Sequence, residues 1–355
     1  MKKRMAVCIS AYEPGGQSVV LEETTKRFAK EYDIDLYCIF SSKLKPEWIK
    51  NLYHVKPWLN RYVPMINNVF IEQIKSRNYS VIHCHDSLPF LDSFCRNSIA
   101  YYVTCHGNTD WQYRDGIISK IDGILSLFFY RKPYKKAKKI VAISKYIQNW
   151  LWDKYGVDSV LIYNGVNFEK FKKLDRENRK ADSPIMLYFG QLSFRKGIFD
   201  LLNAVKSLRI KYPDIVLQLG GFGERKFIEK IKAFAVRNKM KKNIILLGYV
   251  SDAEQSNYYN NCDVVVTASY WEGFGLPIVE AYSCNKPIFV RNCTAMKELV
   301  VDEGFRFNNV VELVHGVDYF FSNRKKSDSS GQFSFNADIF NWEYCCNKYL
   351  ETFKT

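Results

Sequence analysis

Two glutamates separated by seven residues mark the part of this sequence best suited to chemistry. Residues 271–280 read Trp-Glu-Gly-Phe-Gly-Leu-Pro-Ile-Val-Glu, so Glu272 and Glu280 flank a Gly-Phe-Gly turn and a proline, Pro277. A proline is favoured at the first position of a helix, and the apolar run at 263–269 predicts a buried strand before the turn. The stretch is therefore predicted to fold as strand, glycine loop and helix. Open α/β sheets bind ligands at such loops, at the carboxyl ends of their strands.

The start of this helix predicts a site for an anion. The first amides of a helix have no helical partner, and those of Leu276, Ile278 and Val279 would face a phosphate. Carboxylates accept hydrogen bonds from vicinal hydroxyls, and Glu272 and Glu280 would lie at different distances from the amides. A phosphate between two hydroxyl-bearing rings fits this arrangement. The alternative is purely structural: Glu272 caps the helix, and Glu280 is a solvated first-turn acid favoured by the helix dipole.

The run Glu-Gly-Phe-Gly-Leu-Pro-Ile-Val-Glu-Ala that begins at Glu272 resembles the signature of family 4 of the retaining glycosyltransferases, which have the GT-B fold. The resemblance implies that Glu272 contacts hydroxyls of the donor sugar and that Glu280 binds the ribose of the nucleotide. It also implies that the backbone amides of Phe274, Gly275 and Leu276 bind the diphosphate.

Residues 190–197, Gly-Gln-Leu-Ser-Phe-Arg-Lys-Gly, carry a second part of the resemblance. The family usually has an arginine and a lysine here, which hold the diphosphate as it leaves. Lys196 matches the lysine, but Gln191 stands at the usual arginine position, and a neutral amide supplies no charge. Either Arg195 substitutes for the arginine or the site has one cation fewer.

The N-terminal half supplies two further candidates. Residues 5–40 predict a βαβ opening whose glycine loop lacks the three-glycine dinucleotide fingerprint, which argues against a hydride-transfer enzyme. In the resembled family a Gly-Gly loop here closes over the donor diphosphate, so Gly16 is a candidate contact. A glycine turn needed only for backbone shape is the alternative. His106, at a Thr-x-His-Gly strand end, matches the histidine that lies beside the donor sugar in relatives.

Histidines and cysteines gather at two predicted strand ends, as His83, His85, Cys105 and His106. These residues could suggest a metal site, but they have no established ligand spacing, so we expect no metal. The ten cysteines include no Cys-x-x-Cys pair. We predict that they are reduced, in a cytoplasmic protein.

The 355-residue chain is long enough for two domains, and the strand, loop and helix pattern of its start begins again at residue 185. This repetition predicts the α/β class and, with the resemblance, the GT-B architecture of two facing Rossmann-like domains with an interdomain cleft. We predict an acceptor-binding domain at 1–174, a linker at 175–184 and a nucleotide-sugar-binding domain at 185–335. The helix at 336–355 is expected to pack back on the N-terminal domain, as in relatives.

The positive charge is concentrated in the N-terminal half. Residues 1–180 carry 30 Lys and Arg against 18 Asp and Glu, a net +12, and residues 181–355 carry 22 against 19, a net +3. An anionic membrane surface or a lipid-phosphate acceptor could explain this, and the lack of nucleic-acid motifs ranks nucleic acid last. No apolar run approaches the roughly 20 residues that span a bilayer. The apolar stretch 117–130 leads into six positive charges at 131–139. This pattern is typical of an interfacial anchor, but it also fits a core helix with a solvated basic end, which we favour.

Together these features predict a retaining, nucleotide-sugar-dependent hexosyltransferase that acts on a glycan or lipid-linked oligosaccharide in cell-surface polysaccharide or glycan assembly. We expect it to need no metal or other cofactor and to act in the cytoplasm or at the inner face of the membrane. The predicted catalytic residues are His106, Lys196 and Glu272, and the predicted donor-binding residues are Gly16, Arg195, Phe274, Gly275, Leu276 and Glu280. Two alternatives stay open: a sugar-nucleotide epimerase or phosphorylase on the same fold, and a non-catalytic subunit that binds a glycan or partner.

Overall fold

The computed structural model describes residues 2–56, 68–107, 117–174, 183–323 and 337–354. The chain folds into two compact units, here called the first domain (Met1–Gly165 with Asp338–Thr355) and the second domain (Val166–Ala337). Most of the linker expected at 175–184 lies outside the described residues. The predicted architecture of two Rossmann-like domains is confirmed.

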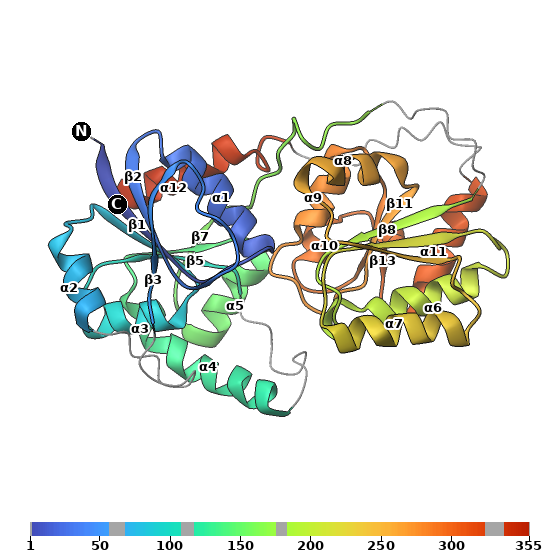
Figure 1. Cartoon of the computed structure of the whole chain (residues 1–355), viewed down its shortest axis with the longest axis horizontal. Helices are drawn as coiled ribbons and strands as arrows, with labels where there is room; N and C mark the ends of the chain where they lie inside the picture. The colour runs from blue at the N-terminus through green and yellow to red at the C-terminus, as the bar shows by residue number, and fades with distance from the viewer. Residues whose placement is uncertain (1, 57–67, 108–116, 175–182, 324–336, 355) are drawn as a thin grey trace. The chain divides into compact units, whose positions relative to one another are not determined.

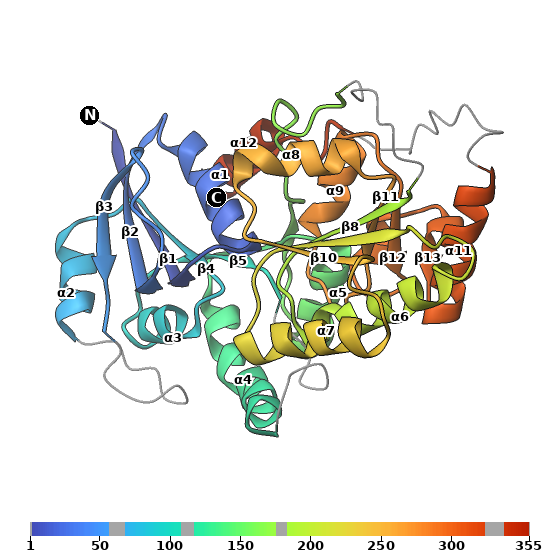
Figure 2. The same ribbon diagram turned by 45° about the vertical axis from the view of Figure 1, so that its right-hand side comes forward.

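The first domain is built on a parallel sheet with the strand order β3-β2-β1-β4-β5-β6-β7 among the described residues. Figure 2 shows β3, β2 and β1 side by side at one edge. The strands are β1 (Lys3–Tyr12), β2 (Tyr32–Ser41), β3 (Ile49–His54), β4 (Val81–His85), β5 (Tyr102–Cys105), β6 (Lys139–Ala142) and β7 (Val160–Leu161). The order reverses between β1 and β4, and such switch points are where open α/β sheets bind ligands.

The last helix of the chain is part of the first domain. The helices here are α1 (Gly16–Phe28), α2 (Asn68–Ser76), α3 (Leu88–Arg96), α4 (Ile117–Lys136), α5 (Lys145–Tyr155) and α12 (Trp342–Lys354). α12 lies beside α1 (Figure 1), where the rings of Tyr349 and Phe353 pack against Phe28 with centroids 6.0 and 5.6 Å apart. The Tyr102 hydroxyl also donates to the Phe353 carbonyl at 2.9 Å, which ties α12 to the sheet.

Gly165 shows how closely the chain passes α12 before it enters the second domain. A Cβ atom at this position would lie 2.6 Å from the backbone nitrogen of Trp342 and 2.7 Å from its indole ring. Because both distances are far shorter than a carbon contact allows, only glycine fits here. The glycine at position 165 is thus required by its packing against Trp342.

The second domain repeats the same topology with the order β10-β9-β8-β11-β12-β13 among the described residues. Its strands are β8 (Ile185–Phe189), β9 (Val216–Gly220), β10 (Ile244–Gly248), β11 (Val264–Thr267), β12 (Ile288–Arg291) and β13 (Arg306–Phe307). Every neighbouring pair is parallel. Strands buried on both faces read as continuous apolar runs, and β8 and β11 are such runs in the sequence.

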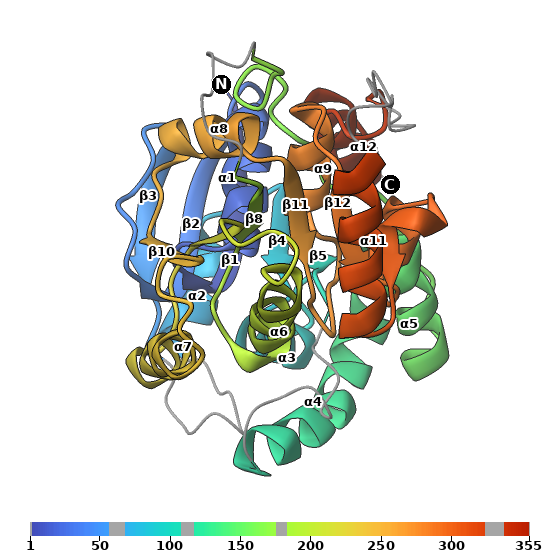
Figure 3. The same cartoon turned by 90° about the vertical axis from the view of Figure 1, so that its right-hand side faces the viewer.

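Helices cover both faces of the second sheet. They are α6 (Ile198–Leu208), α7 (Arg225–Arg237), α8 (Asp252–Asn261), α9 (Leu276–Ser283), α10 (Met296–Leu299) and α11 (Val310–Asn323), with short 3-10 turns η2 (Phe194–Lys196) and η3 (Glu303–Phe305). In Figure 1, α6 and α7 lie on one face of the sheet and α8 and α9 on the other. Figure 3 shows α11 next to α6, and both helices contribute to one buried core, with Leu201, Val205, Leu313 and Val317 among its members.

α4 agrees with the prediction at its basic end and differs from it on one face. The helix continues to Lys136, so four of the six charges lie in its last turns, where their side chains are exposed. The expected burial is wrong for one face, because Ile117 and Phe128 are 79% and 72% exposed. Among the helices of the described residues, none has the length and apolarity needed to cross a membrane. The ten cysteines, which all lie in the described residues, form no disulfide.

Candidate active site

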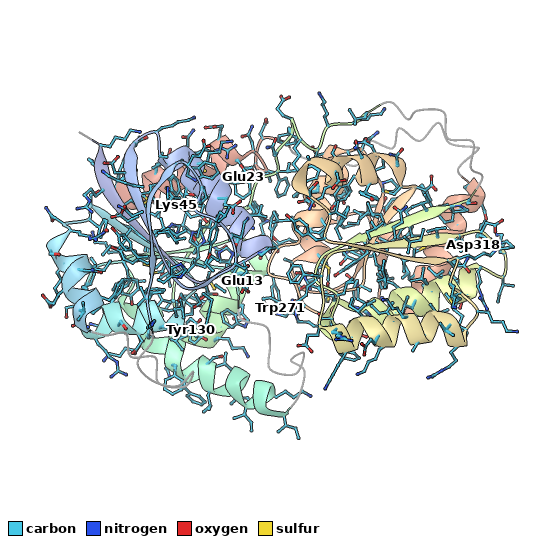
Figure 4. The ribbon with its side chains drawn as sticks, viewed as in Figure 1. Glu13, Glu23, Lys45, Tyr130, Trp271 and Asp318 are labelled. Atoms are coloured by element: carbon cyan, nitrogen blue, oxygen red, sulfur yellow. The ribbon has the colours of Figure 1, made fainter. Side chains whose placement is uncertain are left out.

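Two loops of the second domain meet at the carboxyl ends of β8 and β11. Gly197 ends the turn η2 in the left-handed conformation, with φ of 65°. A Cβ there would lie 2.1 Å from the carbonyl oxygen of Ala268, so glycine is required for the two loops to approach. Two hydrogen bonds then join the loops: the Tyr270 amide donates to the Arg195 carbonyl at 2.9 Å, and Arg195 Nη1 donates to the Trp271 carbonyl at 2.8 Å. Trp271 is labelled in Figure 4.

The joined loops bring two predicted catalytic residues into contact. Lys196 Nζ lies 2.5 Å from Glu272 Oε1, and the two side chains are only 16% and 17% exposed. Because the two residues are 76 positions apart in sequence, the spacing within either motif does not predict this contact. The site thus holds a cation and a carboxylate directly beside the start of α9.

Burial and the neighbouring charges shift the pKa values of both Lys196 and Glu272. Burial alone would raise the pKa of Glu272, but the charges of Lys196 and Arg195 outweigh it and hold the pKa below its ordinary value. Burial, assisted by the Arg195 charge, lowers the pKa of Lys196 despite the attraction of Glu272. The lowered pKa of Glu272 keeps its carboxylate ionised near pH 7, beside the lysine that an anionic ligand would meet.

The N-terminus of α9 supplies backbone donors, though fewer than expected. Gly275 caps the helix with φ of 109°, a conformation that favours glycine. The Ile278 amide donates to the Gly275 carbonyl at 2.9 Å, so the prediction that it is available to a phosphate is wrong. Val279 lies one residue farther into the helix. Within the described residues the amides of Gly275 and Leu276 have no protein partner, while the side chain of Phe274 is buried beneath the turn.

Thr294 holds the backbone of Glu272 from the loop after β12. Its Oγ1 accepts a hydrogen bond from the Glu272 amide at 3.2 Å. Thr294 has φ of 50°, which is uncommon for a β-branched residue, and Asn285 has φ of 52°. At both positions the left-handed backbone is a conformation that glycine adopts more readily than a residue with a side chain.

Glu280 is oriented by a residue that the sequence reasoning missed. The hydroxyl of Tyr259, on α8, donates to Glu280 Oε2 at 2.6 Å. Tyr259 is fully buried, and burial together with the nearby Glu280 charge raises its pKa well above the ordinary value, so the hydroxyl keeps its proton. A buried tyrosine on a neighbouring helix leaves no signal in the spacing of the glutamate motif.

Gln191 and Arg195 show how the missing arginine affects the site. The Gln191 side chain is exposed, and the Gln191 backbone carbonyl accepts a hydrogen bond from the Tyr188 hydroxyl at 2.9 Å. Arg195 holds the Trp271 carbonyl and lies close enough to Glu272 to lower its pKa. Arg195 therefore adds positive charge to the site while its guanidinium also fixes the loop.

The other two predicted site residues, Gly16 and His106, belong to the first domain. Gly16 is exposed and begins α1. His106 follows β5 and is buried, and its Nε2 lies 3.0 Å from Nδ1 of His85. Burial lowers the pKa of His106 to about 3, so both rings are neutral near pH 7 and one of them donates the shared proton. Among the described residues there is no group of three or more His, Cys, Asp or Glu that could hold a metal ion.

Two family models match this chain in succession. Residues 14–170 match the model described as Glycosyltransferase Family 4, and residues 169–336 match Glycosyl transferases group 1. The chain belongs to the group 1 glycosyltransferases. The family predicted from the motifs is thereby confirmed.

Relatives of this glycosyltransferase occur in bacteria and archaea. An uncharacterized glycosyltransferase of Methanocaldococcus jannaschii is 28% identical over 305 residues, which cover 82% of this chain and 80% of the relative. The O-antigen chain mannosyltransferase B of Escherichia coli is 30% identical over 175 residues, 47% of this chain and 45% of that protein. Anabaena HepE, solved in complex with UDP and glucose, has the same fold, with a TM-score of 0.81, 17% identity and 99% of each chain covered.

Proposed function

We propose that this glycosyltransferase is a retaining enzyme that moves a sugar from a nucleotide-diphosphate donor to a hydroxyl of a glycan or lipid-linked oligosaccharide. The observation that carries the proposal is the contact between Lys196 and Glu272 beside the helix α9. A cation, helical amides and a carboxylate are the groups needed to hold a diphosphate and a sugar hydroxyl side by side. The structure of HepE with UDP and glucose supports a nucleotide-sugar donor, and the Escherichia coli mannosyltransferase supports a glycan acceptor.

In the proposed reaction the bond between the sugar and the diphosphate breaks, and negative charge grows on the departing diphosphate. Lys196 and the amides of Gly275 and Leu276 stabilise that charge from fixed positions, without a metal ion. Donor binding takes Lys196 from Glu272 to the phosphate, which frees the carboxylate to accept a hydrogen bond from the sugar. Arg195 supplies the second positive charge in place of an arginine at position 191.

Three other residues complete the proposed donor site. Glu280, held by Tyr259, binds the ribose hydroxyls. Gly16 approaches the diphosphate and His106 approaches the sugar, both from the first domain, as the resemblance implies. The acceptor carries an anionic group in this proposal, because the first half of the chain has the larger positive charge. We place the reaction in the cytoplasm, at the inner face of a membrane.

Nucleotide release from a panel of UDP-, GDP- and ADP-sugars tests this proposal without knowledge of the acceptor. The assay compares the wild type with Glu272→Ala, in the absence of added metal. Asp214→Asn is the matched control, because Asp214 forms an ion pair with Lys242 at 2.7 Å elsewhere in the same domain. Release from one donor that is lost in Glu272→Ala and kept in Asp214→Asn supports the proposal.

The rival function is a non-catalytic subunit that binds a glycan or a partner, and the exposed neutral Gln191 is the observation that favours it. No release from any donor, together with no nucleotide-sugar binding by calorimetry, would support this rival. An epimerase on the same fold would instead interconvert the nucleotide sugar without an acceptor, and analysis of the sugar product separates that outcome.

A further inference from the structure

The ring of His106 is bound by a residue at the end of the neighbouring strand. His85 is the last residue of β4, which pairs in parallel with β5 (Figure 2), and His106 follows β5 directly. Nδ1 of His85 lies 3.0 Å from Nε2 of His106, and the planes of the two rings are 22° apart. Both residues are buried, at 1% and 7% exposed. Since both rings are neutral, one carries the N–H of this hydrogen bond and the other carries the lone pair.

The second ring nitrogen of His85 indicates where the proton lies. Nε2 of His85 is buried and has no hydrogen-bond partner among the described residues. An N–H group is the less tolerated occupant of that position, because buried N–H groups without an acceptor are rarer in proteins than buried acceptors without a donor. Nε2 therefore carries the lone pair, and Nδ1 of His85 donates its proton to Nε2 of His106.

His83, two residues earlier on β4, follows the same rule. Thr104 donates its hydroxyl proton to the Tyr349 hydroxyl at 3.1 Å, so the Thr104 oxygen is left to accept from Nε2 of His83 at 2.8 Å. The other nitrogen, Nδ1 of His83, is buried without a partner in the described part of the chain and carries the lone pair. In both histidines the nitrogen with a partner holds the proton, and the nitrogen without one does not.

The hydrogen bond from His85 leaves His106 with its proton on Nδ1. An isolated histidine side chain prefers the proton on Nε2, so His106 needs a donor at Nε2 to be held in the other form. Within the ranges that the structure describes, the bond to His85 is the one hydrogen bond of the His106 ring. The Nδ1–H group of His106 is therefore left to donate to a ligand.

We propose that His85 is a positioning residue that fixes the proton of His106 on Nδ1, so that this N–H donates to an oxygen of the donor sugar. The inference rests on the proposed function, in which His106 approaches the sugar. It also gives His106 a single role. A ring whose Nε2 accepts from His85 and whose Nδ1 is protonated is a hydrogen-bond donor and not a base, so the acceptor hydroxyl loses its proton to another group.

The test is a nitrogen NMR spectrum of the full chain with isotope-labelled histidine rings, which separates protonated from unprotonated ring nitrogens. The chain has five histidines, and single substitutions assign each ring. His85→Leu removes the proposed donor, and His85→Asn restores an N–H close to the position of Nδ1. His83→Leu is the matched control, because it also removes a buried histidine of β4 but keeps the hydrogen bond to His106. Nucleotide release is measured for each variant at neutral pH.

The wild type and His83→Leu are expected to show His106 protonated on Nδ1. In His85→Leu the proton should move to Nε2 and kcat/KM for the donor should fall about tenfold, whereas His85→Asn should keep both within about threefold of the wild type. The inference is overturned if wild-type His106 is protonated on Nε2 or if His85→Leu leaves the proton on Nδ1. Equal nucleotide release in the wild type and His85→Leu, or an equal loss in His83→Leu and His85→Leu, would also overturn it.

Failure of this inference is distinguishable from failure of the proposed function. A wild type that releases nucleotide from no donor would contradict the proposed function. The ring spectrum is recorded without a donor, so it still decides which nitrogen of His106 holds the proton and whether His85 sets that choice.

Discussion

Lys196 Nζ and Glu272 Oε1 lie 2.5 Å apart, across two loops that the packing of Gly197 on Ala268 brings together. The two opposite charges form an ion pair that is largely shielded from solvent. In the proposed reaction a diphosphate competes with Glu272 for the lysine, and a sugar hydroxyl replaces the lysine at the carboxylate. The ion pair holds both side chains in place, and we propose that it also sets a cost for donor binding.

Replacing Lys196 with methionine should abolish most donor turnover. The variant leaves the Glu272 carboxylate without its partner and removes the charge proposed to stabilise the leaving diphosphate. We expect nucleotide release to fall by about 10² to 10³, the loss seen when one electrostatic donor is removed from an active site. Steady-state release assays measure this, with Lys242→Met as the control because Lys242 pairs with Asp214 on the surface. A Lys196→Met enzyme within twofold of the wild type would refute the assigned role.

Substitutions at Thr294 should distinguish the effect of its hydroxyl on activity from the effect of its strained backbone on stability. Thr294→Val keeps the shape but leaves the Glu272 amide without its acceptor, at a cost of about 1 to 3 kcal/mol. Thr294→Gly also loses this bond but relieves the left-handed backbone, which costs a non-glycine residue roughly 1 to 2 kcal/mol. We expect both variants to lower kcat/KM about tenfold, with Thr294→Gly the more stable of the two by thermal unfolding. Thr294→Ser should match the wild type, and equal activity in Thr294→Val would show that the bond is irrelevant.

Tyr259→Phe should weaken donor binding more than it slows chemistry. The variant removes only the hydroxyl that orients Glu280, whose proposed ligand is the ribose rather than the reacting sugar. A lost hydrogen bond to a charged group is worth about 1.5 to 3 kcal/mol, so KM for the donor should rise roughly tenfold or more with kcat nearly unchanged. Tyr258→Phe, at the neighbouring and half-buried position, is the control. A fall in kcat with unchanged KM would contradict the ribose assignment.

The buried histidines predict that the first domain loses stability in acid. Burial lowers the pKa of His83 and of His106 to about 3 and that of His85 well below its ordinary value. Unfolded histidine protonates near pH 6.5, so below that pH the unfolded chain binds more protons and stability falls toward the folded pKa values. Burial raises the pKa of Asp86 to about 6, so the contribution of Asp86 to stability grows as the pH falls. This gain offsets the stability lost through about one of the three histidines.

The expected net loss is roughly 1 to 3 kcal/mol per pH unit between pH 6 and 4. Hydrogen exchange of the strands β4 and β5, corrected for intrinsic rates, measures it. His315→Asn is the control, because His315 is an exposed residue of the second domain, and it should leave the pH dependence unchanged. Equal protection of these strands at pH 6 and 4 would contradict the prediction.

The sequence predicts the fold well because its signals are local. The apolar runs at 185–189 and 263–269, the glycine turns between them and the proline in α9 each reflect a backbone requirement that a single residue type satisfies. The exposed face of α4 was not predicted, because apolar spacing alone does not show which face of a helix meets the sheet. Tyr134 and its contact with Asp86 decide that orientation, and the contact joins residues 48 positions apart.

The candidate site was predicted residue by residue but not as a set of contacts. The family motif identifies Glu272 and Lys196, yet their ion pair depends on the close packing of two loops. The roles of Tyr259 and Thr294 arise only in three dimensions, since each acts by holding a motif residue rather than by belonging to the motif. The availability of the Ile278 amide was misjudged because a turn within α9 already binds it.

The competition for Lys196 can be measured directly in Glu272→Gln. Calorimetry of the nucleoside diphosphate and release assays with its sugar donor are run on the wild type, Glu272→Gln and the Asp214→Asn control. We predict that Glu272→Gln binds the diphosphate at least as tightly as the wild type, because Lys196 is released, while its sugar release falls by about 10² or more. Diphosphate binding that weakens together with sugar release, or sugar release that is unchanged, would contradict the assignment of Glu272 to the sugar and Lys196 to the phosphate.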